Sequence, residues 1–348
     1  MISAATQQFL DRKHGLWIDG KETNDYGGGG VGELDVIDPA TEKVISRVGL
    51  GDAKDIDKAV AAARRALAGP WSKMTADERT QVLLRFAALF EKHHQMITEL
   101  AVLDNGMPIM IGESCAPFAA QFLRYYAGWT SKIMGNTMPS AGAGKRPDQL
   151  FAYTAREPIG VVGAITPWND PFGMEMLKIA PVLATGCTLV LKQAEIAPLA
   201  SLLMAELALE AGVPPGVFNV VTGLGEVAGA ALASHEDVNK IAFTGSTEVG
   251  KIIVRAAIGN LKKVSLELGG KSPVVVFPDA DLATAIPGVA MSTFLLQGQN
   301  CVCGSRVFVH RDIADEFAAG VAAFAKQLPV GNGMDRGNMI GPVISGEQ

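Results

Sequence analysis

Two cysteines, Cys301 and Cys303, stand in a short polar segment that reads Gln297-Gly-Gln-Asn-Cys-Val-Cys-Gly-Ser-Arg306. A thiol in a glycine-containing loop, beside main-chain N–H groups and an arginine, is placed where a thiolate forms and attacks a carbonyl carbon. Cysteine is also among the most buried residue types, so a small apolar role is the competing interpretation of each thiol. These residues alone leave open which cysteine reacts.

Glu267 is the second side chain that suits covalent chemistry. It lies between two leucines at the end of a predicted strand and precedes two glycines. We expect a partly apolar environment, which raises the pKa of a carboxyl group and suits a general base. A solvated glutamate beside a glycine turn is the alternative. Paired with a thiol, such a base completes a nucleophile and base set.

Polar residues also follow two other predicted strands. Asn169, in the proline-rich segment 166–171, offers an amide N–H donor that suits an oxyanion, although asparagine is also common in turns. Lys192 and Glu195 follow the next strand and suit the hydroxyl groups of a ribose. A surface ion pair is the other interpretation of these two residues.

Small residues near predicted helix starts indicate phosphate contacts. Gly223, Gly225 and Gly229 resemble the dinucleotide glycine fingerprint, with one residue more than its usual spacing. The segment Phe243-Thr-Gly-Ser-Thr247 places hydroxyl groups at a helix N-terminus, where N–H groups and the helix dipole receive a phosphate. A simple N-cap at Ser246 is the competing view.

The elements that position these residues alternate between strand and helix. The pattern predicts strands at 159–165, 188–191, 217–221 and 240–243, and helices at 172–184, 197–211, 225–233 and 247–257. Such alternation predicts an open, mostly parallel sheet covered on both faces. Ligands of these sheets bind at the carboxyl ends of the strands, where the polar residues above lie.

Other segments are read from local signals. A hairpin is expected at 14–20, a strand-turn-strand unit at 35–45, and a flexible loop at the glycine run 27–30. Thr75 and Glu78 form a capping box that opens a helix. Further helices are expected at 52–67, 96–103 and 113–133, a linker or hairpin at 138–150, and strands at 151–156, 273–277 and 305–309.

Composition limits the possible functions. The 348 residues suggest about two domains, and a net charge of −6 argues against a nucleic-acid partner. The sequence has no run that suits a membrane span or a signal peptide. Four cysteines make no disulfide framework and five histidines lack metal-ligand spacing, so we expect a cytoplasmic protein without a metal site.

Taken in order, the motifs resemble those of the aldehyde dehydrogenase superfamily. The resemblance runs from about Leu16 to the last residue. Its motifs are Pro167-Trp-Asn169, Lys192-Gln-Ala-Glu195, Phe243-Thr-Gly-Ser246, Leu266-Glu-Leu-Gly-Gly-Lys271 and Gly298-Gln-Asn-Cys301 with Gly304-Ser-Arg306.

The resemblance implies a role for each matching residue. Cys301 is the expected nucleophile, because the family's cysteine is the second residue after Gly-Gln, and Cys303 is a neighbour. Glu267 is the expected base, Asn169 with the Cys301 N–H the oxyanion hole, and Lys178 part of a proton path. The expected cofactor-binding residues are Ile165, Thr166, Pro167, Trp168, Lys192, Glu195, Gly225, Gly229, Phe243, Gly245, Ser246, Leu268 and Gly269.

The implied reaction is oxidation of a small-molecule aldehyde to a carboxylic acid, through a thiohemiacetal and a thioester on the cysteine. We expect NAD rather than NADP, because the Glu195 carboxylate repels a 2′-phosphate. A homodimer or homotetramer is expected. Two alternatives are a non-catalytic cofactor-binding or interaction fragment, and an acylating relative that uses coenzyme A; the base Glu267 speaks against the second.

The resemblance also implies a domain plan. We expect a Rossmann-like cofactor domain from 1–135 and 157–266, an oligomerisation hairpin at 136–156, and an incomplete α/β catalytic domain at 267–348. Family members continue beyond residue 348, so we expect exposed apolar strands at 273–277 and 305–309, and a polypeptide that alone is poorly stable and weakly active.

Two residues depart from the family's pattern. Asp170 replaces an apolar or aromatic residue, which we expect to alter the substrate mouth or to perturb Asn169. Gln193 replaces a proline, which we expect to leave the ribose loop less rigid.

Overall fold

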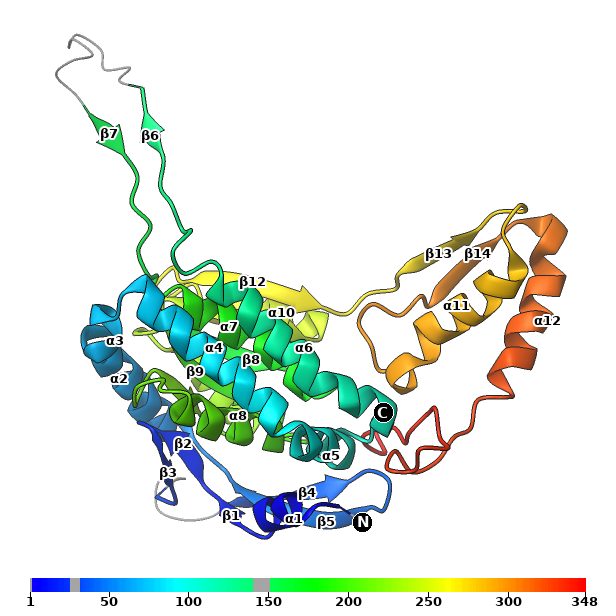
Figure 1. Cartoon of the computed structure of the whole chain (residues 1–348), viewed down its shortest axis with the longest axis horizontal. Coiled ribbons are helices and arrows are strands. Elements are labelled where there is room, and N and C mark those ends of the chain that lie inside the picture. Colours follow the sequence, from blue (N-terminus) through cyan, green and yellow to red (C-terminus); the bar gives the residue numbers. More distant parts are fainter. Residues whose placement is uncertain (1, 26–31, 140–150) are drawn as a thin grey trace.

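A seven-stranded sheet lies at the centre of the computed structural model, which describes residues 2–25, 32–139 and 151–348 (Figure 1). The strand order is β12-β11-β8-β9-β10-β2-β3; neighbours from β12 to β10 are parallel, whereas β2 and β3 join antiparallel. The predicted parallel sheet is therefore confirmed. The strands are β2 (Leu16–Ile18), β3 (Lys21–Thr23), β8 (Val161–Thr166), β9 (Thr188–Gln193), β10 (Phe218–Val220), β11 (Lys240–Gly245) and β12 (Lys263–Leu268).

Helices cover both faces of this sheet, as the strand and helix alternation predicts. One face packs against α7 (Pro171–Ala184) and α8 (Leu199–Glu210), and the other against α2 (Ala53–Ala68), α9 (Ala230–Ser234) and α10 (Thr247–Ala256). A further layer outside α7 consists of α4 (Ala76–Lys92), α5 (His94–Asn105) and α6 (Ile109–Ala127). The short helices are α1 (Ala4–Leu10), α3 (Pro70–Lys73) and the π-helix η2 (Gly225–Gly229).

Burial of strand β8 on both faces explains why its sequence is mainly apolar. Val161 and Ile165 face the core that includes α2 and α9, whereas Val162 and Ala164 face the core that includes α7 and α8. A parallel strand buried on both faces needs apolar residues at every position. The β8 sequence therefore specifies a central strand, and its carboxyl end carries the Asn169 loop.

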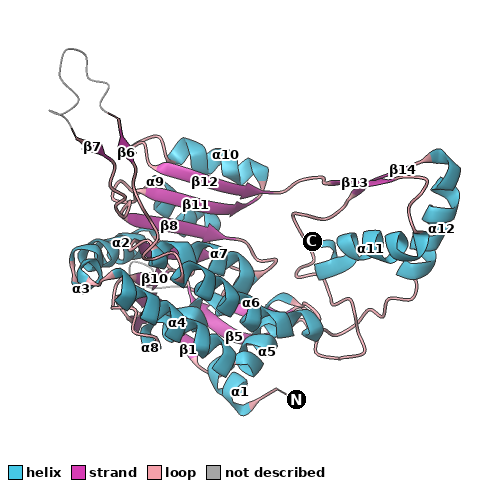
Figure 2. Cartoon of the chain, turned by 45° about the horizontal axis from the view of Figure 1, so that its top comes forward, coloured by secondary structure: helices cyan, strands magenta, loops and turns pink. Residues whose placement is uncertain are grey.

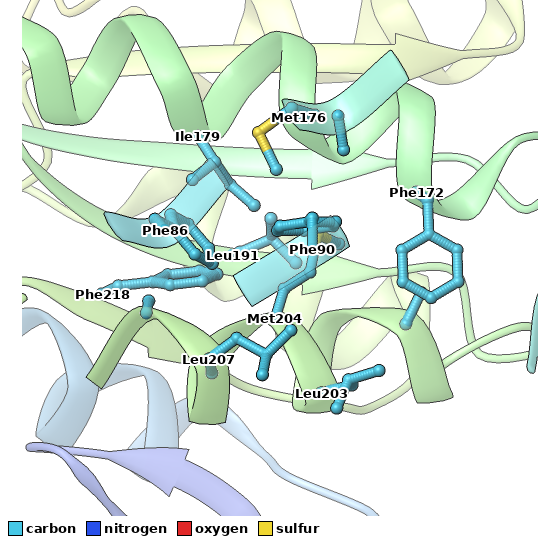
Figure 3. Packing of buried hydrophobic residues seen from close by; sticks show 14 of the residues in the cluster. Phe86, Phe90, Phe172, Met176, Ile179, Leu191, Leu203, Met204, Leu207 and Phe218 are labelled. Atoms are coloured by element: carbon cyan, nitrogen blue, oxygen red, sulfur yellow. The ribbon is translucent and has the colours of Figure 1, made fainter. Parts of the chain in front are cut away.

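Aromatic and aliphatic side chains fill the space between α4, α7, α8 and the sheet. Figure 3 shows Phe86 and Phe90 of α4 beside Ile179 of α7 and Met204 of α8. All four side chains are fully buried. Each contributes about 1.5–3 kcal/mol relative to an exposed position, so this layer holds α7, which carries Lys178, rigidly against the sheet.

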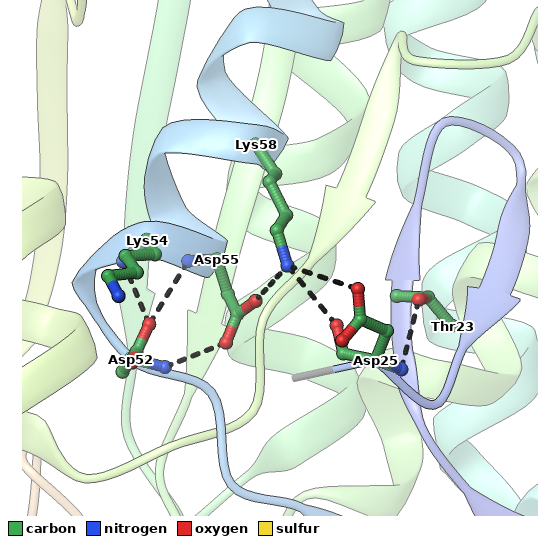
Figure 4. A network of polar contacts seen from close by, with 6 residues as sticks. All are labelled: Thr23, Asp25, Asp52, Lys54, Asp55 and Lys58. Atoms are coloured by element: carbon green, nitrogen blue, oxygen red, sulfur yellow. Dashed lines mark hydrogen bonds and ion pairs between the residues drawn. The ribbon is translucent and has the colours of Figure 1, made fainter. Parts of the chain in front are cut away.

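Side-chain caps fix the starts of two helices. At α2 the Asp52 carboxylate accepts the N–H groups of Lys54 and Asp55, and the Asp55 carboxylate accepts the N–H of Asp52 (Figure 4). Lys58 then bridges Asp55 and Asp25, which ties the helix to the segment after β3. The capping box predicted before α4 is also present, with Thr75 and Glu78 in the expected roles.

Two helices differ in length from the prediction. The helix expected at 96–103 begins at His94 and continues to Asn105, and the one expected at 113–133 spans Ile109–Ala127. Pro108 precedes the first turn of α6, where its missing N–H costs no hydrogen bond, and Gly128 ends the helix.

A smaller unit follows β12 and projects away from the large sheet (Figure 2). It contains the parallel pair β13 (Pro273–Val276) and β14 (Arg306–Val309), with α11 (Leu282–Phe294) packed against α12 (Ala314–Ala325). Val275, Phe277 and Phe308 expose more than half of their surface. The expectation of exposed apolar strands here is confirmed.

Two smaller sheets complete the described fold. A three-stranded sheet consists of β1 (Lys13–His14), β5 (Lys43–Gly49) and β4 (Glu33–Asp38), which confirms the strand-turn-strand unit. The pair β6 (Thr137–Met138) and β7 (Ala152–Tyr153) lies well out along an arm that projects from the large sheet and its helices (Figure 1). The glycine run 27–30 and residues 140–150 of the expected hairpin lie outside the described residues.

The last segment of the chain returns to the turn between α5 and α6. Ile109 N–H donates to the Gly333 carbonyl at 2.8 Å, and Ile344 N–H donates to the Gln299 side chain at 2.9 Å. The expected division at residues 266 and 267 stays a prediction. Both residues lie in β12, which belongs to the large sheet up to Leu268.

Candidate active site

The loop after β8 presents Asn169 toward the cysteine loop. Its side-chain amide donates a hydrogen bond of 2.9 Å to the main-chain carbonyl of Gln299, two residues before Cys301. An asparagine amide has two N–H groups, and one of them is used here. Among the described residues, the main-chain N–H of Cys301 takes part in no hydrogen bond. One N–H of the Asn169 amide and the main-chain N–H of Cys301 therefore remain as donors in these two loops.

Asp170, the first departure from the family's pattern, caps the helix that follows. Its carboxylate accepts the N–H of Gly173 at 3.1 Å, and a Cβ at residue 173 would lie 2.1 Å from a carboxylate oxygen. Burial raises the pKa of Asp170, although the Gly173 N–H opposes that change. The side chain thus holds the start of α7, and Asn169 keeps its bond to Gln299.

The cysteine loop has an unusual backbone. Leu296, Gln297 and Gly298 have φ angles of 54°, 59° and 76°. Side chains larger than glycine are strained in this region, so two successive left-handed residues persist only where other contacts hold them. The Gln297 amide supplies such contacts: it donates to the carbonyls of Gly106 at 2.7 Å and Pro342 at 3.1 Å.

The two cysteines occupy different environments. Cys303 is buried, and its thiol lies 3.4 Å from the Gly298 carbonyl and 3.5 Å from the Thr293 carbonyl. Cys301 is partly exposed and lines a cavity; its sulfur lies 3.7 Å from the side-chain oxygen of Asn300. Only Cys301 is therefore open to a substrate, which is the assignment that the family resemblance implies.

That cavity joins three of the expected catalytic residues. Its volume is about 660 Å³, and Cys301, Glu267 and Lys178 all line it. The rest of the wall is mainly apolar and comes largely from α7, the adjoining strands and the cysteine loop, including Met174, Leu177, Pro181, Val182, Ala242 and Val302. Asn169 does not line the cavity itself but is tied to the same loop as Cys301.

The environment of Glu267 differs from the prediction. The prediction that its leucine neighbours bury the carboxylate is wrong: the side chain is exposed, although it lines the mainly apolar cavity. Its strand β12 forms the edge of the large sheet, and Leu266 and Leu268 point to the opposite face, where they pack beside α10. Adjacent residues of a strand alternate between faces, so leucines on either side do not surround the carboxylate.

Lys178 joins Glu267 through a residue that the sequence did not single out. The Lys178 ammonium donates to the Thr244 hydroxyl at 2.7 Å, and Thr244 is the cross-strand partner of Glu267. Burial lowers the pKa of Lys178, and the Glu267 carboxylate opposes that change. Thr244 belongs to the Phe-Thr-Gly-Ser motif, which was the available signal for it.

Lys192 and Glu195 form an ion pair of 2.6 Å at the carboxyl end of β9. Lys192 is buried and Glu195 is partly exposed. Burial of Glu195 acts against its charge, but the Lys192 ammonium and the N–H of Gly225 together lower the pKa of this carboxyl group. A negative charge therefore stands beside the start of η2, where hydroxyl donors of a ligand find an acceptor.

Gln193, the second departure, contacts the start of α8. Its side chain is fully buried and accepts the N–H of Ser201 at 3.1 Å, and the expected effect on the rigidity of this loop stays a prediction. Asp104 accepts the N–H of Leu199 at 2.9 Å. The two side chains replace the N-cap bond that Pro198 cannot supply to α8.

The glycine and serine residues expected to bind the cofactor differ in how much free space surrounds them. A Cβ at Gly225 or Gly229 would meet no atom within 4 Å, so space remains beside the start of η2. A Cβ at Gly245 would lie 2.5 Å from the Phe243 ring, which is itself buried. Ser246 is the N-cap of α10 and accepts the N–H of Val249 at 3.2 Å, as the competing interpretation held.

The remaining expected cofactor residues flank these groups at strand ends. Ile165 and Thr166 are buried at the end of β8, and Pro167 and Trp168 are partly exposed in the loop that follows. Leu268 ends β12 and Gly269 is exposed after it. These expected residues thus lie at the same end of the sheet, where β8, β9, β11 and β12 have their carboxyl ends.

A buried carboxyl pair beneath the Asn169 loop escaped the sequence reasoning. Burial raises the pKa of Asp104 to about 8. Glu175 of α7 is fully buried, its two oxygens have no hydrogen-bond partner among the described residues, and burial, with Asp104 and Asp170 nearby, raises its pKa well above the ordinary value. A glutamate inside an apolar helix is the only sequence signal for this pair.

Among the described residues, no cluster of histidine, cysteine, aspartate and glutamate side chains has the arrangement of a metal site. None of the described helices combines the length and the apolar character that a membrane span needs.

Known proteins share both sequence and fold with this chain. The sequence model described as "Aldehyde dehydrogenase family" matches residues 28–348. A mitochondrial protein of Arabidopsis thaliana, aldehyde dehydrogenase family 2 member B4, is 50% identical over 315 residues, which cover 90% of this chain and 57% of that protein. The mitochondrial aldehyde dehydrogenase of Homo sapiens is 47% identical over 316 residues, which cover 90% and 60%. The chain thus spans less than two thirds of these two relatives.

Solved structures agree with this similarity. An NAD+ complex of the Bacillus cereus aldehyde dehydrogenase superposes with a TM-score of 0.95 at 41% identity, and the match covers 100% of this chain and 69% of that one. A structure titled as an NADP-dependent enzyme of E. coli superposes with a TM-score of 0.92 at 37% identity, over the same shares of the two chains.

Proposed function

Since the chain belongs to the aldehyde dehydrogenase family, we propose that it oxidises an aldehyde to a carboxylic acid with NAD, through a covalent intermediate on Cys301. The observation that carries this proposal is that Cys301, Glu267 and Lys178 line one cavity. Asn169 is tied to the same loop as the thiol by its bond to Gln299. A nucleophile, a base and an oxyanion donor together make up the set that acyl chemistry on a thiol needs.

Cys301 begins the reaction as a thiolate. Its sulfur adds to the carbonyl carbon, and the electron pair of the C=O bond moves to oxygen. The free amide N–H of Asn169 and the main-chain N–H of Cys301 are the donors proposed for this oxyanion. When bound, NAD accepts the hydride from that carbon. The product on the protein is a thioester between the acyl group and Cys301.

Glu267 completes the cycle. Its carboxylate takes a proton from water as the water oxygen attacks the thioester carbon, and the C–S bond then breaks to release the acid and the Cys301 thiolate. The exposed position of Glu267 gives water direct access to it. Lys178 and Thr244, joined by a hydrogen bond of 2.7 Å, are proposed to pass the proton away from the carboxylate.

The residues present fit a dinucleotide cofactor. Lys192 and Glu195 offer a charged donor and acceptor for ribose hydroxyls, and the open space at Gly225 and Gly229 admits a close approach to η2. Ser246 stands at the start of α10, whose N-terminal N–H groups suit a phosphate. The Glu195 charge favours NAD over NADP, because it repels a 2′-phosphate.

The cavity wall suggests the kind of substrate. Most of the side chains around Cys301 are apolar, among them Met174, Leu177 and Val302, and no cationic group other than Lys178 and Lys240 lines the described cavity. We therefore propose a small aldehyde with an apolar substituent. We also propose a cytoplasmic protein, in line with four free cysteines, and a homodimer or homotetramer joined through the β6–β7 arm.

A single-turnover experiment tests this function. Protein in excess over an apolar aldehyde, mixed with NAD+, is expected to form up to one NADH per aldehyde, and Cys301→Ser is expected to form none. The non-catalytic alternative predicts NAD+ binding without NADH formation. An acylating enzyme would release product faster when coenzyme A is added, whereas the proposed hydrolysis would not change.

A further inference from the structure

The turn between α5 and α6 lies against both loops of the active site. It consists of Asn105, the last residue of α5, then Gly106 and two more residues before α6 begins. Neither Asn105 nor Gly106 lines the cavity that holds Cys301. Each of them nevertheless bonds to one of the two loops that carry the reacting groups.

Asn105 holds the Asn169 loop. Its side chain is 1% exposed, and its amide donates to the main-chain carbonyl of Trp168 at 2.8 Å and to that of Asn169 at 3.4 Å. The other end of the amide, its Oδ1, has no partner among the described residues. The donor end alone therefore accounts for the hydrogen bonds of this buried side chain.

Gly106 holds the cysteine loop. Its main-chain carbonyl accepts the Gln297 amide at 2.7 Å. Its φ of 89° is left-handed, which ends α5 and turns this carbonyl away from the helix. Gln297 is itself in the strained left-handed region, so its side-chain bonds hold a backbone that would otherwise relax.

We propose that Asn105 is a positioning residue that, with Gly106, fixes the distance between the oxyanion donor Asn169 and the nucleophile Cys301. Both loops are attached to adjacent residues of one turn, and they are also joined directly by the Asn169 bond to Gln299. The three bonds form a closed ring that leaves the loops little freedom to move apart. A misplacement of about 1 Å in such a pair costs on the order of 100-fold in rate.

This inference rests on the proposed function, and it predicts how substitutions of Asn105 and Asn169 combine. If Asn105 acts by positioning Asn169, its loss must matter only while Asn169 is present. Asn105→Leu removes the donor and keeps a similar volume, and Asn105→Ala guards against a steric artefact. Asn260→Leu is the control, because Asn260 also donates to two main-chain carbonyls, but those of Glu236 and Val238, which belong to neither loop of the active site.

The experiment is a double-mutant cycle on single-turnover NADH formation at saturating NAD+ and aldehyde. Asn105→Leu is expected to slow hydride transfer about 10- to 100-fold, and less than twofold further in an Asn169→Ala background. Alkylation of Cys301 by iodoacetamide needs no oxyanion hole and is expected to stay within about twofold. Equal slowing in both backgrounds, or no slowing by either Asn105 variant, overturns the inference; Asn260→Leu is expected to match the unchanged protein.

A second readout does not depend on aldehyde oxidation. In asparagine-labelled protein, the side-chain amide signals of Asn169 are expected to shift in Asn105→Leu and in Gln297→Ala but not in Asn260→Leu. Unmoved signals in the first two variants overturn the inference. If the unchanged protein forms no NADH while these shifts occur, the proposed function fails and the anchoring by Asn105 stands.

Discussion

The Lys178 ammonium lies 2.7 Å from the hydroxyl oxygen of Thr244, and Thr244 pairs across the strands with Glu267. Helix α7 and strands β11 and β12 thus bring a base and a buried cation to one side of the cavity. In the proposed mechanism, the second half of the reaction depends on Glu267 and Lys178, whereas the first half depends on Cys301 and Asn169.

Glu267→Gln is therefore expected to separate the two halves. NADH formation in the first turnover stays within about tenfold of normal, because the thiol and its oxyanion donor are intact. Later turnovers fall roughly 100-fold or more, since loss of a general base costs about 10²–10⁴ in rate. Stopped-flow NADH absorbance measures both phases. An equal loss in both phases would assign Glu267 to the first half instead.

Thr244→Val is expected to slow thioester hydrolysis without changing the first turnover. The substitution removes the acceptor of the Lys178 ammonium and keeps the β-branched shape that suits β11. A hydrogen bond to a charged group contributes about 1.5–3 kcal/mol, which corresponds to roughly 10- to 100-fold in rate. Thr244→Ser, which keeps the hydroxyl, is the control and should restore hydrolysis.

Stability should fall as pH rises because of Asp104. The folded carboxyl keeps its proton up to a pKa of about 8, whereas the unfolded group loses it near its ordinary value of 3.8. The folded state therefore binds more protons between these values, and the free energy of unfolding decreases through that window. Glu175 acts in the same direction.

Asp104→Asn removes this dependence and keeps an oxygen that accepts the Leu199 N–H. Its melting temperature is expected to exceed that of the unchanged protein by a few degrees at pH 9 and to be close to it at pH 5. Calorimetry at both pH values measures the difference. Asp279→Asn, at an exposed position, serves as the control. If the variant melts at a lower temperature than the unchanged protein at pH 9, other groups stabilise the ionised Asp104 carboxylate in the folded state.

Glu195→Gln is expected to shift cofactor preference toward NADP. The charge that repels a 2′-phosphate is removed, while an acceptor for a ribose hydroxyl is kept. We expect the Kd for NADP+ to fall about tenfold and that for NAD+ to change less. Titration calorimetry with both cofactors provides the measurement, with Glu316→Gln of α12 as the control. Unchanged affinity for NADP+ would place the ribose away from Glu195.

The strand and helix order could be predicted because each signal is local. Continuous apolar runs mark β8 and β9, and the capping box at Thr75 and Glu78 marks the start of α4. The contacts between distant segments could not be predicted in this way. Asn105 and Trp168 are 63 residues apart in the chain, and no periodicity links them.

The environment of Glu267 shows the same limit. The leucines beside it in sequence lie on the other face of β12, and what decides its exposure is the cavity formed with α7. The hydrogen bond of Gln193 could not be predicted for a related reason, because its partner Ser201 becomes a neighbour only after α8 packs on the sheet. Residue types and motifs along the chain supplied the candidates for chemistry, whereas the surroundings of these residues are decided by packing.

The most direct test of the account is to trap the acyl group. Protein with Glu267→Gln, incubated with NAD+ and an apolar aldehyde, should accumulate a thioester that tandem mass spectrometry of the peptide carrying both cysteines assigns to Cys301. The adduct should require NAD+, persist in Cys303→Ser and vanish in Cys301→Ser. An acyl group on Cys303, or NADH formed without any adduct on Cys301, would contradict the account.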